Sequence, residues 1–314
     1  MEYNEFVNCV RAEVEKLCGE GDKVYVNSIR KNNSQRHDAI VIRKEVDNAS
    51  PSIYLNYFFE EYKNGKDIGD IVEDIIKLDM ESREKLEFDI EEFFVWDNVK
   101  DKVFFRLINK LNNVDILKDV PHKEIYDLAM VFYCTVNMND YDLATTMIHS
   151  IYLEKWGITE DELYERAIHN TRNFHKPVLK SMNEMLVDLL GVTYNDEIEK
   201  ESVISQFKGD EEWYPMYVLT SDKKLLGSIC MAYDDLLHDF GMEHGNFYII
   251  PSSIHELILV PDSEDITPSG LLNMIIDVND GQLPKEEILS YNLYYYEVEL
   301  GKIKVINNVK QKIL

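Results

Sequence analysis

The tightest group of potentially reactive side chains in this sequence is Ser253, His255 and Glu256, within the stretch FYIIPSSIHELILVPD at 247–262. An imidazole can act as a general base toward a serine hydroxyl, which would make Ser253 a nucleophile for hydrolysis. Residues two apart on a strand share a face, so Ser253 and His255 could meet while Glu256 points the other way. A catalytic triad would therefore need a carboxylate from elsewhere. The alternative is a Pro-Ser-Ser turn whose hydroxyls bind backbone groups.

Known catalytic motifs do not extend this group. The sequence has no Gly-x-Ser-x-Gly motif, and position 259 is Leu259 where a zinc protease motif starting at His255 would need a second histidine. The glycine patterns GxGxxG and GxxxxGK[ST], which cradle phosphates, do not occur either. No motif therefore indicates a cofactor, and the cofactor requirement stays unknown.

A second candidate site is a divalent-cation site in YDDLLHDFGMEHGN at 233–246. Asp234 and His238 lie four residues apart, so a helix would place both on one face. With His244 they would offer the oxygen and nitrogen ligands that a hard or borderline cation accepts. The alternative is an ordinary helix surface with a histidine near its C-terminal end, where the helix dipole favours positive charge.

Apolar periodicity predicts the elements that must position these groups. Helical spacing of apolar residues predicts helices at 3–18, 67–77, 98–112, 180–190, 227–240 and 268–279. Continuous or alternating apolar runs predict strands at 125–136, 143–149, 216–220 and on both sides of the Pro-Ser-Ser turn. Two hairpins are expected, one joining 23–29 to 37–44 through the polar segment KNNSQR and one at 292–306.

Helix-capping residues mark three further boundaries. Ser50-Pro51 is typical of a helix start, and Gly65 of the following helix end. Thr159 with Glu162 predicts a capping box that opens another helix.

The alternation of helices and strands predicts an α+β (mixed α/β) fold with short mixed or antiparallel sheets, arranged in two halves. The length of 314 residues is enough for two domains. The predicted regions are an N-terminal helix-hairpin-helices region (1–115), a central strand-helix region (116–191), an acidic linker or boundary (192–212) and a C-terminal α+β region (213–314).

The formal net charge is −26, from 33 basic and 59 acidic residues. This charge disfavours binding to nucleic-acid phosphates or anionic membranes, both of which attract Lys and Arg. It is compatible with a basic protein partner or with mimicry of a polyanion, and the alternative is plain solubility. The strongest local negative field is at 60–92, with 13 acidic and 5 basic residues, although a solvated helix face gives the same pattern.

Cysteine use and hydropathy indicate the compartment. The four cysteines are scattered without a CxxC motif, which predicts neither a disulfide framework nor a zinc site. The N-terminus has no signal-peptide core, and no apolar run approaches the roughly 20 residues of a membrane span. We therefore expect a cytoplasmic protein without membrane contact.

Several segments together resemble a known family. They are KNNSQRHDAIVIRKE (31–45), ASPSIYLNYFFEEYKNGKDI (49–68), LEKWGITEDELYERAIHNT (153–171) and MYVLT followed by FYIIPSSIHELILVPD. Over residues 1–300 the chain resembles a domain-of-unknown-function family of gut Firmicutes, often encoded among mobile-element genes. The segment from Trp156 to Asn170 is more distantly similar to YtpQ-like proteins. The resemblance implies a cytosolic protein and transfers no catalytic residues.

Two functional hypotheses follow. The first is a non-enzymatic cytosolic protein that binds another macromolecule through an acidic surface, in its most specific form a polyanion mimic that occupies a basic protein. The second is a hydrolase or metal-dependent enzyme that uses the segment 252–256, with Asp234, His238 or His244 nearby.

Overall fold

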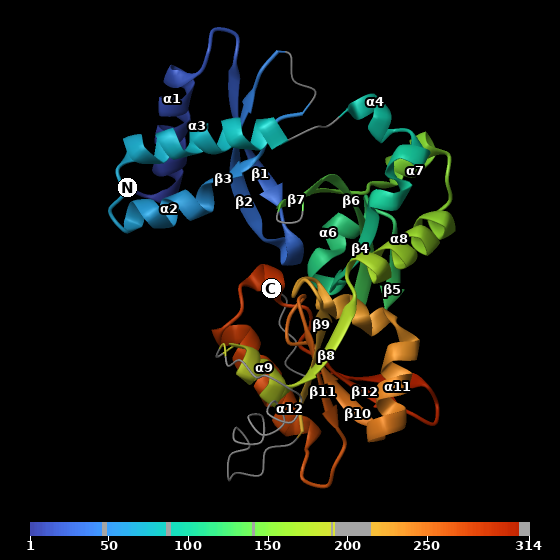
Figure 1. Ribbon diagram of the computed structural model, residues 1–314. Coiled ribbons are helices and arrows are strands. Elements are labelled where there is room, and N and C mark those ends of the chain that lie inside the picture. The colour runs from blue at the N-terminus through green and yellow to red at the C-terminus, as the bar shows by residue number, and fades with distance from the viewer. Residues whose placement is uncertain (46–48, 86–88, 140–141, 190, 192–214, 308–314) are drawn as a thin grey trace.

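The computed structural model describes the chain except for residues 46–48, 86–88, 140–141, 190, 192–214 and 308–314 (Figure 1). Helices alternate with three sheets, and every strand pair among the described residues is antiparallel. The predicted α+β class is confirmed. The predicted acidic linker at 192–212 lies outside the described residues, and the proposed division into regions stays a prediction.

The N-terminal body is a small sheet covered by helices, with its own apolar core (Figure 1). Its elements are α1 (Tyr3–Leu17), β1 (Lys23–Arg30), β2 (Arg36–Arg43), β3 (Ile53–Tyr54), α2 (Leu55–Lys63) and α3 (Ile68–Lys85). The predicted hairpin and the helix stop at Gly65, which has a φ of 99°, are confirmed. The predicted helix start at Ser50-Pro51 is wrong, because Ile53 is buried and pairs with Ile40 as a strand, so that the helix begins at Leu55.

The central sheet has the strand order β4-β6-β5, with β7 also paired to β6. Its strands are β4 (Val103–Asn109), β5 (His122–Ile125), β6 (Leu128–Asn139) and β7 (Asp142–Met147). The predicted strands at 125–136 and 143–149 are confirmed. The helix predicted at 98–112 is wrong, because only α5 (Trp96–Val99) is α-helical there, and η2 (Lys100–Lys102) leads into β4. A strand that is buried on both faces has a continuous apolar run, which periodicity cannot distinguish from a buried helix.

The C-terminal sheet has six strands in the order β13-β12-β10-β11-β9-β8. They are β8 (Pro177–Ser181), β9 (Tyr217–Ser221), β10 (Phe247–Ile250), β11 (Leu257–Pro261), β12 (Leu293–Glu297) and β13 (Lys302–Ile306). Helix α11 (Asp234–His244) covers one face, and α9 (Met182–Leu189) and α12 (Pro268–Gly281) lie on the other (Figure 1). The predicted hairpins and the helix near 268–279 are confirmed. The helix predicted at 227–240 is instead η4 (Gly227–Ala232), a 3₁₀ segment, followed by α11.

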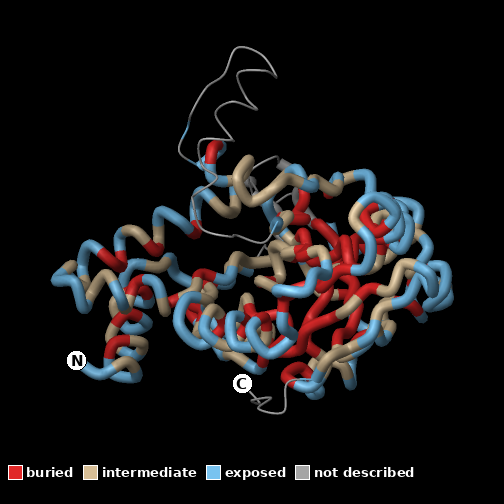
Figure 2. Tube along the Cα trace, turned by 90° about the horizontal axis from the view of Figure 1, so that it is seen from below, coloured by how far each residue is buried: buried red, intermediate tan, exposed pale blue. Residues whose placement is uncertain are grey.

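The central and C-terminal sheets share one hydrophobic core. Buried side chains of both, such as Phe105 and Phe132 with Phe247 and Tyr294, belong to a single cluster. Figure 2 shows the buried residues concentrated away from the N-terminal helices. The C-terminal loops and the central sheet are therefore held in a fixed relation to each other.

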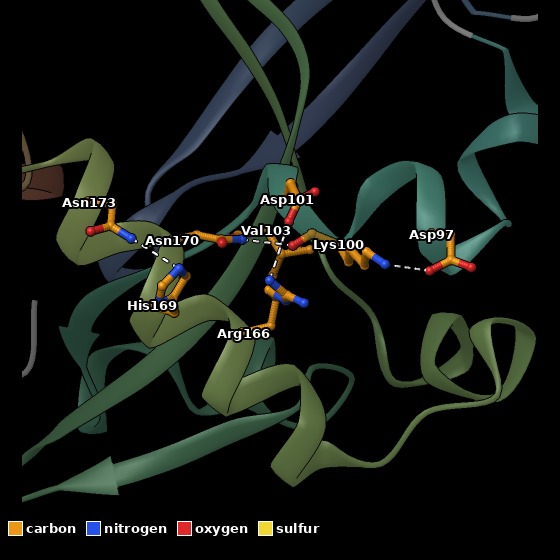
Figure 3. Close-up of polar contacts among 8 residues, drawn as sticks. All are labelled: Asp97, Lys100, Asp101, Val103, Arg166, His169, Asn170 and Asn173. Carbon is orange, nitrogen blue, oxygen red and sulfur yellow. Dashed lines mark hydrogen bonds and ion pairs between the residues drawn. The ribbon is translucent and has the colours of Figure 1, made fainter.

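Helix α8 (Glu160–Phe174) fixes the start of β4 (Figure 3). The predicted capping box at Thr159 and Glu162 is confirmed. Near the other end, Asn170 Nδ2 donates to the carbonyl oxygens of Lys100 at 2.7 Å and Val103 at 2.9 Å. Because these carbonyls lie where the 3₁₀ turn becomes a strand, the Asn170 amide satisfies backbone groups that neither element can pair.

The polar KNNSQR segment contains the buried junction between all three parts. Asn33, in η1 (Asn32–Ser34), is fully buried with a φ of 54° and lies against η3 (Leu111–Asn113) and η5 (Lys285–Glu287). Its Nδ2 donates to the carbonyls of Lys285 and Ile288, both at 2.7 Å, and its backbone N–H donates to Asn113 Oδ1 at 2.9 Å. We call this set of contacts the asparagine junction. It ties the N-terminal hairpin to the central and C-terminal parts at once.

Candidate functional site

The Ser252–Glu256 segment is a compact loop between β10 and β11. Ser253 is 5% exposed, and its Oγ accepts a hydrogen bond from the backbone N–H of His255 at 3.0 Å. The Ser253 N–H donates to the Glu256 carbonyl at 3.2 Å, and Ser252 Oγ donates to Glu256 Oε1 at 3.1 Å. For Ser253 this geometry is the predicted alternative, a turn whose hydroxyl binds a backbone group, whereas the Ser252 hydroxyl binds a side-chain carboxylate. No hydrogen bond joins Ser253 Oγ to the His255 ring in this described loop.

The His255 ring is held by groups outside its own loop. Its Nδ1 accepts from the Leu226 N–H at 3.3 Å, and its Nε2 lies 3.8 Å from Glu287 Oε1. An accepting Nδ1 places the proton of the neutral ring on Nε2, which faces the carboxylate. In this tautomer neither ring nitrogen offers a free lone pair to a serine hydroxyl.

The loop backbone is docked on η4. The His255 carbonyl accepts from Thr220 Oγ1 at 2.8 Å and from the Gly227 N–H at 2.9 Å. A Cβ at Gly227 would lie 2.4 Å from that carbonyl oxygen, so only glycine fits. The carboxylate beside His255 is thus Glu287 and not Glu256, and no local sequence pattern links residues that are 32 positions apart.

The predicted metal ligands do not converge. Asp234, His238 and His244 all lie on α11, but the His244 ring packs on Phe240 and Tyr217 with centroid distances of 4.4 and 4.7 Å. Across the described ranges, no group of three or more His, Cys, Asp or Glu side chains is arranged to hold a metal ion. One helical turn aligns Asp234 with His238, but His244 is turned into an aromatic cluster.

His255 and Glu287 line a cleft of about 720 Å³ where the N-terminal hairpin, the central sheet and the C-terminal loops meet. We call it the junction cleft. Its walls come from segments within 29–32, 54–57, 115–120, 145–149, 254–255 and 286–287, together with His37, Arg106 and Tyr133. The sequence patterns did not reveal it, because its walls come from parts of the chain that are distant in sequence.

A second depression, of about 480 Å³, lies on the outer surface of the N-terminal helices. Its apolar residues are Leu17 of α1 and Ile76 and Met80 of α3, and its charged residues are Glu73, Lys77, Glu81 and Glu84. We call it the acidic groove. Apart from Leu17, its residues belong to the stretch 60–92 that the sequence indicates as the most acidic.

Residues 3–298 match the model of a family described as a family of unknown function, DUF5688. The chain belongs to this family. The predicted resemblance to a domain-of-unknown-function family is thereby confirmed over nearly the whole chain. Neither a curated protein nor a solved structure gave a significant match.

Two further properties of this DUF5688 member concern its environment. No helix in the described parts of the chain is both long and apolar enough to cross a membrane. The four cysteines are free thiols, and burial raises the pKa of Cys134 and Cys230 to about 12, which keeps both protonated and unreactive near neutral pH.

His175, at the end of α8, is a buried histidine whose two ring nitrogens have no hydrogen-bond partner among the residues that the structure describes. Burial and then the nearby Lys223 lower its pKa from about 6.5 to about 4, against an opposing effect of Asp222. In the unfolded chain this imidazole is therefore protonated below about pH 6.5, whereas in the folded chain it is protonated only below about pH 4. The stability contributed by the neutral ring is complete above pH 6.5 and is lost as the pH falls toward 4.

We expect the free energy of unfolding to fall by about 3 kcal/mol between pH 7 and pH 4 because of this histidine. In urea unfolding, the free energy of unfolding of a His175→Phe variant should fall less between pH 7 and pH 4, and the difference from the parent protein should be this amount. Replacing the exposed His169 by Gln is the matched control and should leave the pH profile of the parent protein. Parallel profiles for the parent and His175→Phe would contradict the prediction.

Proposed function

We propose that this DUF5688 member is a non-enzymatic, cytoplasmic binding protein that holds a basic, amphipathic segment of a partner protein in the acidic groove. The observation that carries the proposal is the pairing of exposed apolar side chains with carboxylates. Leu17 is 62% and Met80 56% exposed, and Glu73, Glu81 and Glu84 flank them. A helix with an apolar stripe bordered by Lys and Arg is complementary to such a surface.

The charge of the whole chain supports a basic partner. A net charge of −26 attracts basic proteins over long distances and repels nucleic acids and anionic lipids. The attraction is screened over roughly 8–10 Å at physiological ionic strength, so binding should weaken as salt is added. Mimicry of a polyanion is the most specific version of this proposal, with a nucleic-acid-binding protein as the partner.

A defined peptide tests the groove. An 18-residue Lys/Leu amphipathic helix should bind the protein in a fluorescence anisotropy titration and lose affinity from 50 to 300 mM salt. Changing Glu73, Glu81 and Glu84 together to Gln should weaken binding by about tenfold or more, because three carboxylates leave the contact surface. Met80→Ser should also weaken it, because the apolar floor is interrupted.

The matched control removes the same charge elsewhere, by changing the exposed Glu154, Glu165 and Glu243 to Gln. This variant should bind within about twofold of the parent protein if the groove is the site. If both triple variants lose the same affinity for the peptide, the binding is non-specific charge attraction and the groove is not the site. The proposal is also contradicted if the peptide does not bind the parent protein.

The competing proposal is a hydrolase that uses Ser253, His255 and a carboxylate, or a metal-dependent enzyme with Asp234, His238 and His244. The fact in its favour is that His255 and Glu287 line the junction cleft together. Labelling by a fluorophosphonate that disappears in Ser253→Ala, or a stoichiometric metal in the purified protein, would favour it. The bonds of Ser253 and of the His255 ring make us expect no labelling, and the packing of His244 on Phe240 makes us expect no metal.

A further inference from the structure

Arg106, in the wall of the junction cleft, is a cation that has no counter-ion among the described residues. It comes from the middle of β4, opposite Val131 of β6, and its side chain shares the sheet face with Ile108 and Tyr133. Its Nε is fully buried and has no hydrogen-bond partner in the described parts of the chain, and no carboxylate there lies within 4 Å of the guanidinium. The centroid of the Tyr133 ring lies 6.0 Å from the guanidinium carbon.

The other positively charged or protonatable groups around Arg106 in the cleft mostly have partners. Arg30 lies 4.0 Å from Asp115, His37 lies 2.8 Å from Glu286, and the Nζ of Lys31 lies 3.9 Å from the Tyr54 ring centroid. Arg106 is partly buried, and removing part of an unpaired guanidinium from water costs free energy. Burial accordingly lowers the pKa of Arg106, although the group stays charged. A leucine or methionine would fill the same position on the sheet without this cost.

We propose that the junction cleft binds a small organic monocarboxylate whose carboxylate pairs with Arg106. A guanidinium offers parallel N–H donors that match the two oxygens of a carboxylate. Since one cation is unpaired, one negative charge completes the site. A phosphate dianion fits less well, because Asp115, Asp119, Glu286 and Glu287 also line the cleft and would repel the second charge.

The rest of the cleft suits the body of such a ligand. Its volume of about 720 Å³ is in the range of small-molecule sites. Tyr54, Tyr57 and Tyr133 supply aromatic surface, and Asn56 has a buried Oδ1 to which no described group donates. A ring that carries a hydroxyl or amino group would satisfy these walls. This site shares no residue with the acidic groove, so the result for one proposal does not affect the other.

The test is isothermal titration calorimetry, in which 4-hydroxybenzoate is added to the full-length protein at constant ionic strength. We expect saturable binding at one site. Arg106→Met should raise the Kd by about tenfold or more, because the charge-assisted pair is lost. Arg30→Met is the matched control, since the Arg30 guanidinium already faces Asp115, and should change the Kd by less than about threefold.

A second readout separates a binding role from a structural one. Without ligand, Arg106→Met should unfold at the same or a higher urea concentration than the parent, because an unpaired charge has been replaced by an apolar side chain. The proposal is overturned if 4-hydroxybenzoate does not bind, if Arg106→Met leaves the Kd unchanged, or if the free variant is clearly less stable. Tighter binding of inorganic phosphate at Arg106 would overturn the choice of a monoanion.

Discussion

Replacing Asn33 by alanine is expected to lower the free energy of unfolding by about 3–5 kcal/mol. The variant would leave the carbonyls of Lys285 and Ile288 without their shared donor, and each buried, unpaired group costs about 1–3 kcal/mol. The donor contact from Asn113 Nδ2, at 3.2 Å, would be lost as well. Alanine would also have to adopt a φ of 54°, which costs a residue with a Cβ roughly 1 kcal/mol more than asparagine or glycine.

Two comparisons separate these contributions in urea unfolding. Asn33→Gly removes the amide but accepts the positive φ, so it should be about 1 kcal/mol more stable than Asn33→Ala. Asn173→Ala removes an exposed amide from α8 and should change stability by less than about 0.5 kcal/mol. If Asn33→Ala behaves like Asn173→Ala, the asparagine junction does not hold the three parts together.

Replacing Asp127 by alanine is expected to lower the free energy of unfolding by about 3–4 kcal/mol. The Asp127 carboxylate, between β5 and β6, accepts hydrogen bonds from Ser290 Oγ at 2.5 Å, Asn292 Nδ2 at 2.9 Å and Tyr294 Oη at 2.6 Å. Tyr294 is fully buried, and burial followed by the negative charge of Asp127 raises the pKa of its phenol well above the ordinary value. Without the carboxylate, this fully buried hydroxyl loses the acceptor to which it donates.

Tyr294→Phe provides the comparison for this second prediction. It removes the hydroxyl and leaves the carboxylate with two donors, so it should cost only about 1 kcal/mol. The double variant should then be more stable than the sum of the two single changes predicts, because a phenyl ring at this position needs no acceptor once Asp127 is gone. Additive losses would mean that the two groups are not coupled. Asp101→Ala, at an exposed ion pair with Arg166, controls for the loss of charge (Figure 3).

Both predicted changes would also affect the junction cleft. The asparagine junction positions 29–32 and 285–288, which contribute two of its walls, while Asp127 joins the central sheet to the segment after η5. Loss of either contact should therefore weaken carboxylate binding even though neither side chain lines the cleft. The stability of the junction and the shape of the proposed site depend on the same buried polar groups.

Local features of the fold could be predicted from the sequence wherever neighbours along the chain decide them. The capping box at Thr159 and Glu162, the stop at Gly65 and the hairpin of β1 and β2 are set within a few residues. The apolar run of β4 predicts a helix by its spacing, whereas its burial on both faces as a strand depends on α8 and on the neighbouring strands. Tertiary contacts, and not propensity, decided that element.

The candidate sites also combine features that the sequence determines with features that only the tertiary structure determines. The sequence alone determined the α+β class, the family resemblance, the acidic character and the turn around Ser253. It singled out His255 but not Glu287, and it gave no signal for Arg106, Asn33 or Asp127. The roles of Asn33 and Asp127 depend on the groups to which they are hydrogen-bonded, and the role of Arg106 depends on the lack of a described partner for its Nε. Those neighbours lie from 25 to more than 250 positions away, so only the folded chain brings them together.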